Sequence, residues 1–320
     1  RSCEDGVVTT CNIVDIIRTE TAALREKTTI LDGGIELSNG QLLAAVDRVG
    51  ATLVREGVKP LERVAFLCED CADYIIGSLA ILQVGAVVVP VSPLLMGDEL
   101  EQVLGRMDVN VLIYDAAVHT RADGRKLDAQ GFCVREVFLS RRNARNDQPP
   151  QYARLNPAFI RFSSGTTGAS KGVLLSHETI MARTDAADRG LRITDRDVVL
   201  WVLSMSFHFV VTILLYLRRA ATILICRQPF PESFLEAAKR GKATIFYASP
   251  FHYYLLATSP LVPADSLSEV RLAISTAMKL SDETAGRFAE KFGFELVEAY
   301  GIIELGLPFI NTGERRRKRG

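Results

Sequence analysis

The chain has 320 residues, of which 48% are hydrophobic and 24% are charged, enough for one large packed unit or two smaller ones. Lysine plus arginine total 38, and aspartate plus glutamate also total 38, so the formal net charge is zero. This balance argues against a protein dedicated to nucleic-acid binding.

Helical and strand patterns alternate along the first half of the chain. The apolar residues at positions 42, 46, 49 and 53 share one face of a helix that Gly57 ends. Further elements expected up to residue 190 are a strand at 63–67, a helix at 74–84, a strand at 86–89 stopped by Pro90, a helix that starts with a capping-box-like Asp98 and Glu101 and ends at Met107, strands at 109–114 and 134–139, a loop at 141–151 and a helix at 176–190.

Residues 198–217 form a nearly continuous apolar run that is long enough to suggest a transmembrane helix. Ser204, Ser206 and His208 interrupt it, so we expect no transmembrane segment but a strand at 198–203, a polar turn, a helix at 207–219 and a strand at 221–225. The elements expected after it are a helix at 231–240, a strand at 243–248, a helix at 250–258, a strand at 270–275, a helix at 281–292 and a strand at 295–297. Continuous apolar strands between helices indicate an α/β fold with parallel strands covered on both faces.

The six cysteines are scattered without a disulfide framework, as is typical of a reducing compartment. Residues 1–14 show no signal peptide, and we therefore expect a cytoplasmic protein. Cys68 and Cys71 form one Cys-x-x-Cys with no second pair for zinc. Structural cysteines are favoured over redox chemistry, which stays the alternative.

The stretch from Phe162 to Val173 combines five hydroxyls, three glycines and Lys171 between apolar flanks. Glycines let backbone N–H groups turn toward an anion, while hydroxyls and a lysine add donors and positive charge. The spacing is not that of a Walker loop. We predict a phosphate-binding loop, and a solvated polar linker is the alternative.

Ser164 to Lys171 resembles the phosphate-loop signature of adenylate-forming enzymes, Ser-Gly-Thr-Thr-Gly-x-Pro-Lys-Gly, with Ser170 in place of the proline. Residues 79–90, 271–281 and 298–304 resemble three further motifs of this family in the same order. The resemblance implies that the nucleotide is bound by Ser163, Ser164, Gly165, Thr166, Thr167, Gly168, Lys171, Ser275, Thr276, Ala277, Tyr300, Gly301 and Ile303.

The same resemblance implies roles for single residues. Tyr300 is expected to stack on adenine, and Glu304 to hold the Mg²⁺ that bridges the phosphates, as suits an aromatic face and a hard oxygen ligand. Thr276 and Ala277 replace two glycines of the adenine wall, and Ile303 replaces a threonine that contacts the α-phosphate. The expected catalytic residues are His208, Glu304 and Lys171.

His208 stands where acyl- and aryl-CoA synthetases carry a histidine near the substrate carboxylate, whereas amino-acid-activating domains usually have aspartate. A lone core histidine is the alternative. Six aromatic or apolar residues could line an acyl pocket around it or pack in the core: Phe207, Phe209, Val210, Tyr247, Phe251 and Tyr253.

The expected fold is α/β, with two packed parallel-sheet subdomains flanked by helices and the nucleotide site between them. Residues 1–58 and 190–312 would form the subdomain with the acyl and adenine pocket, and residues 59–189 the one with the phosphate loop. The family's Thr-Gly-Asp motif, arginine-containing hinge and late lysine are not found, so we expect a chain that lacks the small barrel and the C-terminal domain. Residues 313–320 form a basic tail, for which a solvated end is favoured over binding to nucleic acid or anionic lipid.

The function that the resemblance implies is ATP-dependent activation of a hydrophobic carboxylic acid, fatty or aryl, to an acyl-adenylate. The complete enzyme would pass the acyl group to coenzyme A or to a carrier-protein thiol, and a homodimer is compatible with such a protein. The alternatives are a catalytically weak nucleotide-binding module, suggested by Ile303 and the missing motifs, an amino-acid adenylation domain, and a membrane-inserted protein.

Overall fold

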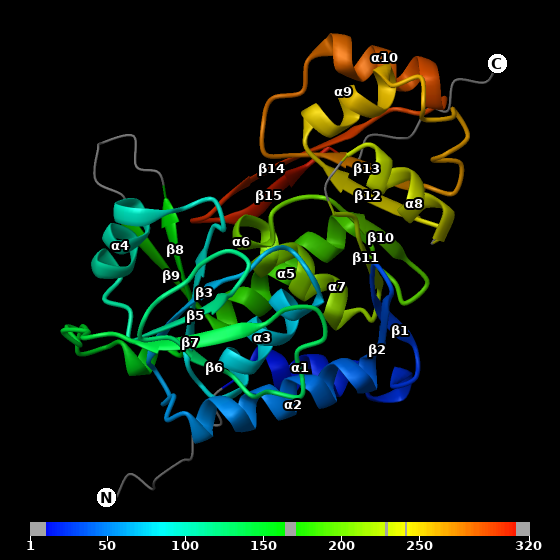
Figure 1. The fold of residues 1–320 in the computed structure, drawn as a ribbon. Helices are drawn as coiled ribbons and strands as arrows, with labels where there is room; N and C mark the ends of the chain where they lie inside the picture. Colours follow the sequence, from blue (N-terminus) through cyan, green and yellow to red (C-terminus); the bar gives the residue numbers. More distant parts are fainter. Residues whose placement is uncertain (1–10, 164–170, 228–229, 241, 312–320) are drawn as a thin grey trace, which may run out of the picture.

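The computed structural model describes residues 11–163, 171–227, 230–240 and 242–311 (Figure 1). Its two β-sheets lie on either side of a group of central helices, and further helices cover their outer faces. The predicted α/β fold with two packed, largely parallel sheets is therefore confirmed.

The first sheet has eight strands in the order β15-β14-β13-β12-β10-β11-β1-β2. The pairs from β14 to β1 are parallel, and the edge strands β2 and β15 pair antiparallel. Its strands are β1 (Thr28–Asp32), β2 (Ile35–Ser38), β10 (Val198–Trp201), β11 (Thr222–Ile225), β12 (Ile245–Ala248), β13 (Leu272–Ser275), β14 (Val297–Ile302) and β15 (Gly306–Ile310).

The second sheet has seven strands in the order β6-β7-β5-β3-β4-β8-β9. Its four inner strands, β5, β3, β4 and β8, are parallel, and the strands at both edges pair antiparallel. Its strands are β3 (Arg63–Leu67), β4 (Val87–Val91), β5 (Val111–Asp115), β6 (Arg125–Lys126), β7 (Val137–Arg141), β8 (Pro157–Ser163) and β9 (Lys171–Ser176). The two sheets divide the chain near residues 58 and 189, and the assignment of subdomain roles to these segments stays a prediction.

Apolar burial explains the layers. One large cluster joins α1, α2, α3, α5 and α7 to the facing sides of both sheets, a second packs α8, α9 and α10 on the outer side of the first sheet, and a third packs α4 on the outer side of the second. The helices are α1 (Ile13–Glu20), α2 (Asn39–Arg55), α3 (Ala72–Gln83), α4 (Gly97–Arg106), α5 (His177–Leu191), α6 (Met205–His208), α7 (Leu214–Arg218), α8 (Glu232–Arg240), α9 (Pro250–Thr258) and α10 (Asp282–Phe292), with short 3-10 helices at Ala22–Leu24 and Ala153–Leu155.

Three local predictions were wrong. β4 continues through Pro90 to Val91, where it still pairs with β3. Its pairing with β8 is at Val88↔Phe159, so the proline, which has no N–H to donate, lies beyond that pairing. α4 has no capping box, since its N-cap is Met96, and Glu101 instead pairs with arginines. The segment after β10 is α6, a π-helical stretch at Phe209–Ile213 and then α7, rather than one helix.

No helix in the described ranges is long and apolar enough to cross a membrane. The apolar run at 198–217 is divided among β10, α6, the π-helical stretch and α7, as the interrupting polar residues indicated.

Candidate functional site

The predicted phosphate loop joins β8 to β9. The two strands form an antiparallel hairpin whose last registered pair is Ser163↔Lys171, so the loop leaves the carboxyl end of β8. Five of the predicted ligands lie outside the described residues: Ser164, Gly165, Thr166, Thr167 and Gly168. Phosphate binding by this loop stays a prediction.

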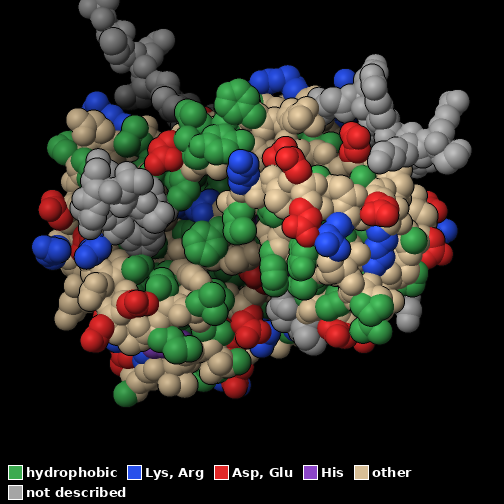
Figure 2. All heavy atoms as spheres, turned by 90° about the horizontal axis from the view of Figure 1, so that it is seen from above, with side chains coloured by type: hydrophobic (Ala, Val, Ile, Leu, Met, Phe, Trp, Pro, Cys, Tyr) green, Lys and Arg blue, Asp and Glu red, His purple; other side chains and the backbone are tan. Residues whose placement is uncertain are grey.

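A cavity of about 120 Å³ lies between the two sheets. Figure 2 shows the face of the molecule seen from above, which is hollowed near its middle, with hydrophobic side chains gathered around the hollow. The cavity gathers five of the predicted site residues from three separate segments: His208, Thr276, Ala277, Gly301 and Ile303. The rest of its lining is Arg161, Leu175, Arg183, Phe207, Val210, Val211, Thr212, Tyr247, Ile302, Gly306 and Leu307.

His208 ends α6 and precedes the π-helical stretch, an irregularity that often marks a functional site. Its ring lies edge-on to Trp201 and Tyr247, with centroids 6.2 and 6.3 Å away. Burial, together with the positive charge of Arg161, lowers the pKa of His208 to about 4. The imidazole is therefore neutral at neutral pH and can accept or donate one hydrogen bond in the cavity.

The start of α6 is fixed from the other sheet. The Asp70 carboxylate, which follows β3, accepts a hydrogen bond of 2.7 Å from the Met205 amide. Burial raises the pKa of Asp70 to about 6. This contact holds the segment that carries His208 against the second sheet.

The turn between β14 and β15 carries the residues of the last motif. The Arg183 guanidinium on α5 donates to the carbonyls of Ile303, at 2.7 Å, and of Glu304. A Cβ on Gly301 would lie 2.9 Å from the Gly306 carbonyl oxygen, so glycine is needed for this close approach. Tyr300 is 59% exposed, which leaves its ring accessible.

Glu304 is exposed beside this turn, and neither it nor Tyr300 lines the cavity. Within the described ranges, no three or more His, Cys, Asp or Glu side chains group together as metal ligands would. A single exposed carboxylate nevertheless fits Mg²⁺, which keeps several waters and takes other ligands from phosphates.

The turn after β13 forms another wall of the cavity. The Thr276 amide donates to the Ala248 carbonyl at 3.0 Å, which continues the sheet by one residue. Ala277 has φ +72°, a left-handed conformation that favours glycine. The glycine-to-alanine replacement seen in the sequence therefore stores backbone strain. Ser275 is buried outside the cavity lining.

The six proposed pocket residues separate into three groups. Phe207, Val210 and Tyr247 line the cavity. Phe209 is buried in the central core, and the Tyr253 hydroxyl donates to the Phe246 and Ile274 carbonyls on the outer side of the first sheet. Phe251 is exposed. Core packing is therefore the correct interpretation for Phe209 and Tyr253.

Sequence reasoning missed two arginines of the lining, Arg161 and Arg183. Arg161 is the one charged residue in the apolar run 158–162, a signal that was visible in the sequence. Arg183 gave no such signal, because an arginine on a half-exposed helix is ordinary.

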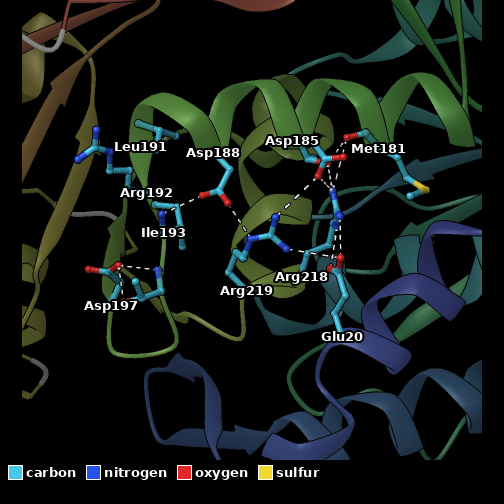
Figure 3. A network of polar contacts seen from close by, with 12 residues as sticks. Glu20, Met181, Asp185, Asp188, Leu191, Arg192, Ile193, Asp197, Arg218 and Arg219 are labelled. Atoms are coloured by element: carbon cyan, nitrogen blue, oxygen red, sulfur yellow. Dashed lines mark hydrogen bonds and ion pairs between the residues drawn. The ribbon is translucent and has the colours of Figure 1, made fainter.

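An ion-pair network joins α1, α5 and α7 (Figure 3). Arg218 of α7 bonds to Glu20 of α1 at 2.7 and 2.9 Å and to Asp185 of α5 at 2.7 Å, and Arg219 bonds to Asp188 at 2.8 Å. Since α7 continues the segment of His208 and α5 carries Arg183, the network fixes two walls of the cavity relative to each other.

Residues 18–320 match the family model described as AMP-binding enzyme. Among curated proteins, the chain is 23% identical over 304 residues to the crotonobetaine/carnitine–CoA ligase of Salmonella typhimurium, covering 88% of this chain and 58% of that one.

Two solved structures illustrate the similarity of fold. ATP-bound MatB from Rhodopseudomonas palustris superposes with a TM-score of 0.77 at 23% identity, covering 95% of this chain and 63% of that chain. The anthranilate CoA ligase AuaEII in complex with anthranoyl-AMP gives a TM-score of 0.81 at 19% identity, covering 96% and 63%. The chain thus spans about three fifths of the length of these relatives.

Proposed function

Because the chain belongs to the family of AMP-binding enzymes, we propose that it carries out, or forms the larger part of a protein that carries out, ATP-dependent activation of a carboxylic acid. The observation that carries this proposal is the gathering of His208, Thr276, Ala277, Gly301 and Ile303 around one cavity beside the β8–β9 hairpin. The names of the relatives, which are CoA ligases, support coenzyme A as the final acceptor.

The proposed first step joins the acid to AMP. A carboxylate oxygen attacks the α-phosphorus of ATP, the bond to the bridging oxygen breaks, and pyrophosphate leaves with both electrons of that bond. The protein contributes mainly position and charge: Ser164, Thr166, Thr167 and Lys171 would hold the β- and γ-phosphates. In the second step a thiol of coenzyme A, or of a carrier protein, would displace AMP and form the thioester.

Mg²⁺ would be held by Glu304, where it would neutralise phosphate charge. His208, neutral at neutral pH, would donate one hydrogen bond to the substrate carboxylate without adding a positive charge of its own. Tyr300, with its ring exposed beside the cavity, would provide the stacking face for adenine.

We propose a hydrophobic acid as substrate, since the walls contributed by Leu175, Val210, Val211 and Leu307 are apolar. Histidine at position 208, rather than aspartate, also disfavours an α-amino acid, whose ammonium would need a negative partner.

A second candidate is a nucleotide-binding module with little catalysis. Ile303 lines the cavity with an apolar side chain where the family has a hydroxyl, which removes a donor to the α-phosphate.

Exchange of labelled pyrophosphate into ATP tests both candidates, with panels of fatty, aryl and amino acids. Acid-dependent exchange with fatty or aryl acids is expected. Exchange with amino acids alone would refute the proposed substrate class. Calorimetric binding of ATP without any exchange would favour the second candidate over the first.

A further inference from the structure

Arg161 brings a positive charge into a mostly apolar cavity. It lies on β8 opposite Val173 of β9. Its neighbour Ile160 packs in the outer cluster of the second sheet, and Phe159 packs in the central cluster. Since side chains alternate along a strand, Arg161 points to the same side as Phe159, toward the central helices, where it lines the cavity with His208.

No acidic side chain compensates this charge in the described part of the chain. No hydrogen bond or ion pair of its guanidinium is found there, and residues 164–170 contain neither aspartate nor glutamate. Two neighbours act on its pKa in opposite directions: the phenol of Tyr74 raises it, and the cation Arg183 lowers it. Burial, together with the repulsion from Arg183, lowers the pKa of Arg161 to about 10, so it remains charged at neutral pH.

Other arginines that are wholly or partly buried differ from Arg161. Arg218 is paired with two carboxylates, Arg63 lies 3.6 Å from Asp108 and bonds to the Met107 carbonyl, and Arg183 donates to the carbonyls of the β14–β15 turn. A guanidinium has five N–H donors, and those of the half-buried Arg161 face the cavity without a protein acceptor among the described residues. Arg161 is therefore poised for an anion that arrives with a ligand.

We propose that Arg161 binds a carboxylate of the acid substrate. This inference rests on the proposed function and names the residue that would recognise the acid. The fork of a guanidinium matches a carboxylate with two parallel hydrogen bonds.

The carboxylate can come from two places on the acid. Either Arg161 binds the reacting carboxylate beside His208, or it binds a second carboxylate at the other end of a short dicarboxylic acid. The two sources predict different selectivity among acids of equal length, which makes them distinguishable by experiment.

The test measures binding of four probe acids by calorimetry: butanoate, butanedioate, benzoate and benzene-1,4-dicarboxylate. Wild type is compared with Arg161→Met, Arg161→Lys and the matched control Arg154→Met, an exposed arginine outside the cavity. Arg161→Met loses a charge-assisted bond and should bind the acids about 10- to 100-fold more weakly than wild type. Arg161→Lys should recover part of the lost affinity, and Arg154→Met should bind the acids like wild type.

A loss for all four acids identifies the reacting carboxylate, and a loss confined to the two dicarboxylates identifies the second one. Unchanged acid binding by Arg161→Met overturns the inference, as does a loss restricted to ATP binding or a wild-type protein that binds none of the acids. Pyrophosphate exchange is scored separately: acid binding that depends on Arg161, without exchange, would refute the proposed function and leave this inference standing.

Stability gives a second measurement that does not depend on a ligand. Because Arg161 is half-buried, lies near the cation Arg183 and has no acidic partner in the described part of the chain, Arg161→Met without ligand should unfold at the same temperature as wild type or higher. A marked fall would mean that Arg161 has a structural partner, and it would contradict the inference.

Discussion

Removing Arg218 should cost more stability than removing any exposed arginine, because it is the buried centre of the network in Figure 3. Its side chain is 3% exposed and bonds to Glu20 and Asp185 at 2.7 Å. Arg218→Met keeps the apolar stem and leaves these two carboxylates with one cation fewer. Breaking a buried pair costs about 3–5 kcal/mol. Glu20 and Asp185 are 29% and 47% exposed and can recover water, so the lower end, about 3 kcal/mol, is expected.

Urea unfolding followed by far-UV circular dichroism measures this loss. The matched control is Arg18→Met, which breaks an exposed pair with Asp47 and should cost below about 1 kcal/mol. If Arg218→Met costs no more than Arg18→Met, the network does not hold α1, α5 and α7 together, and the argument is wrong.

Three further outcomes are expected. Lys171→Ala should leave the melting temperature without ligand nearly unchanged but abolish most of the rise that Mg-ATP produces; an unchanged rise would refute the phosphate loop. Ala277→Gly should stabilise the protein by about 1 kcal/mol in urea unfolding, because φ +72° suits glycine, and a loss would contradict the strain. Burial lowers the pKa of His177, whose Nδ1 accepts from the Ile13 amide, to about 4. The unfolded chain then binds more protons below pH 6.5, so about 3 kcal/mol should be lost between pH 6.5 and 4, and His177→Asn should flatten that loss in unfolding titrations.

Helices and strands with a clear hydrophobic pattern were predictable from the sequence. α2 follows the apolar stripe at positions 42–53, and α9 spans the predicted residues Pro250–Thr258. The buried strand β3 was found from the uninterrupted apolar run at 64–67 that follows Arg63. In each case a single local pattern matches the burial that the fold provides.

Elements that depend on partners were not predictable in this way. β15 becomes a strand because β14 offers it an antiparallel edge, and its own sequence from Gly306 to Ile310 has no strong strand pattern. Pro90 is tolerated because the ladder beside it has ended, a fact about β8 that residues 86–91 do not contain. The π-helical stretch after His208 likewise has no local signature.

The site was predictable as far as its motifs reach. His208, Thr276, Ala277, Gly301 and Ile303 come from segments up to about a hundred residues apart, and the resemblance alone indicated that they meet. The arginines that line the same cavity, Arg161 and Arg183, were not predicted. Whether a guanidinium has a partner is visible only once the neighbours on all sides are known.

A single helix explains how the motifs are held in place. α5 begins directly after β9 and so continues the hairpin that carries the phosphate loop. Through Arg183 it holds the backbone of the Ile303–Glu304 turn, and through Asp185 it pairs with Arg218 on the helix that continues from His208. A shift of α5 therefore moves the proposed phosphate, metal and carboxylate positions together. Residues outside the motifs thus set the geometry in which the motif residues could act.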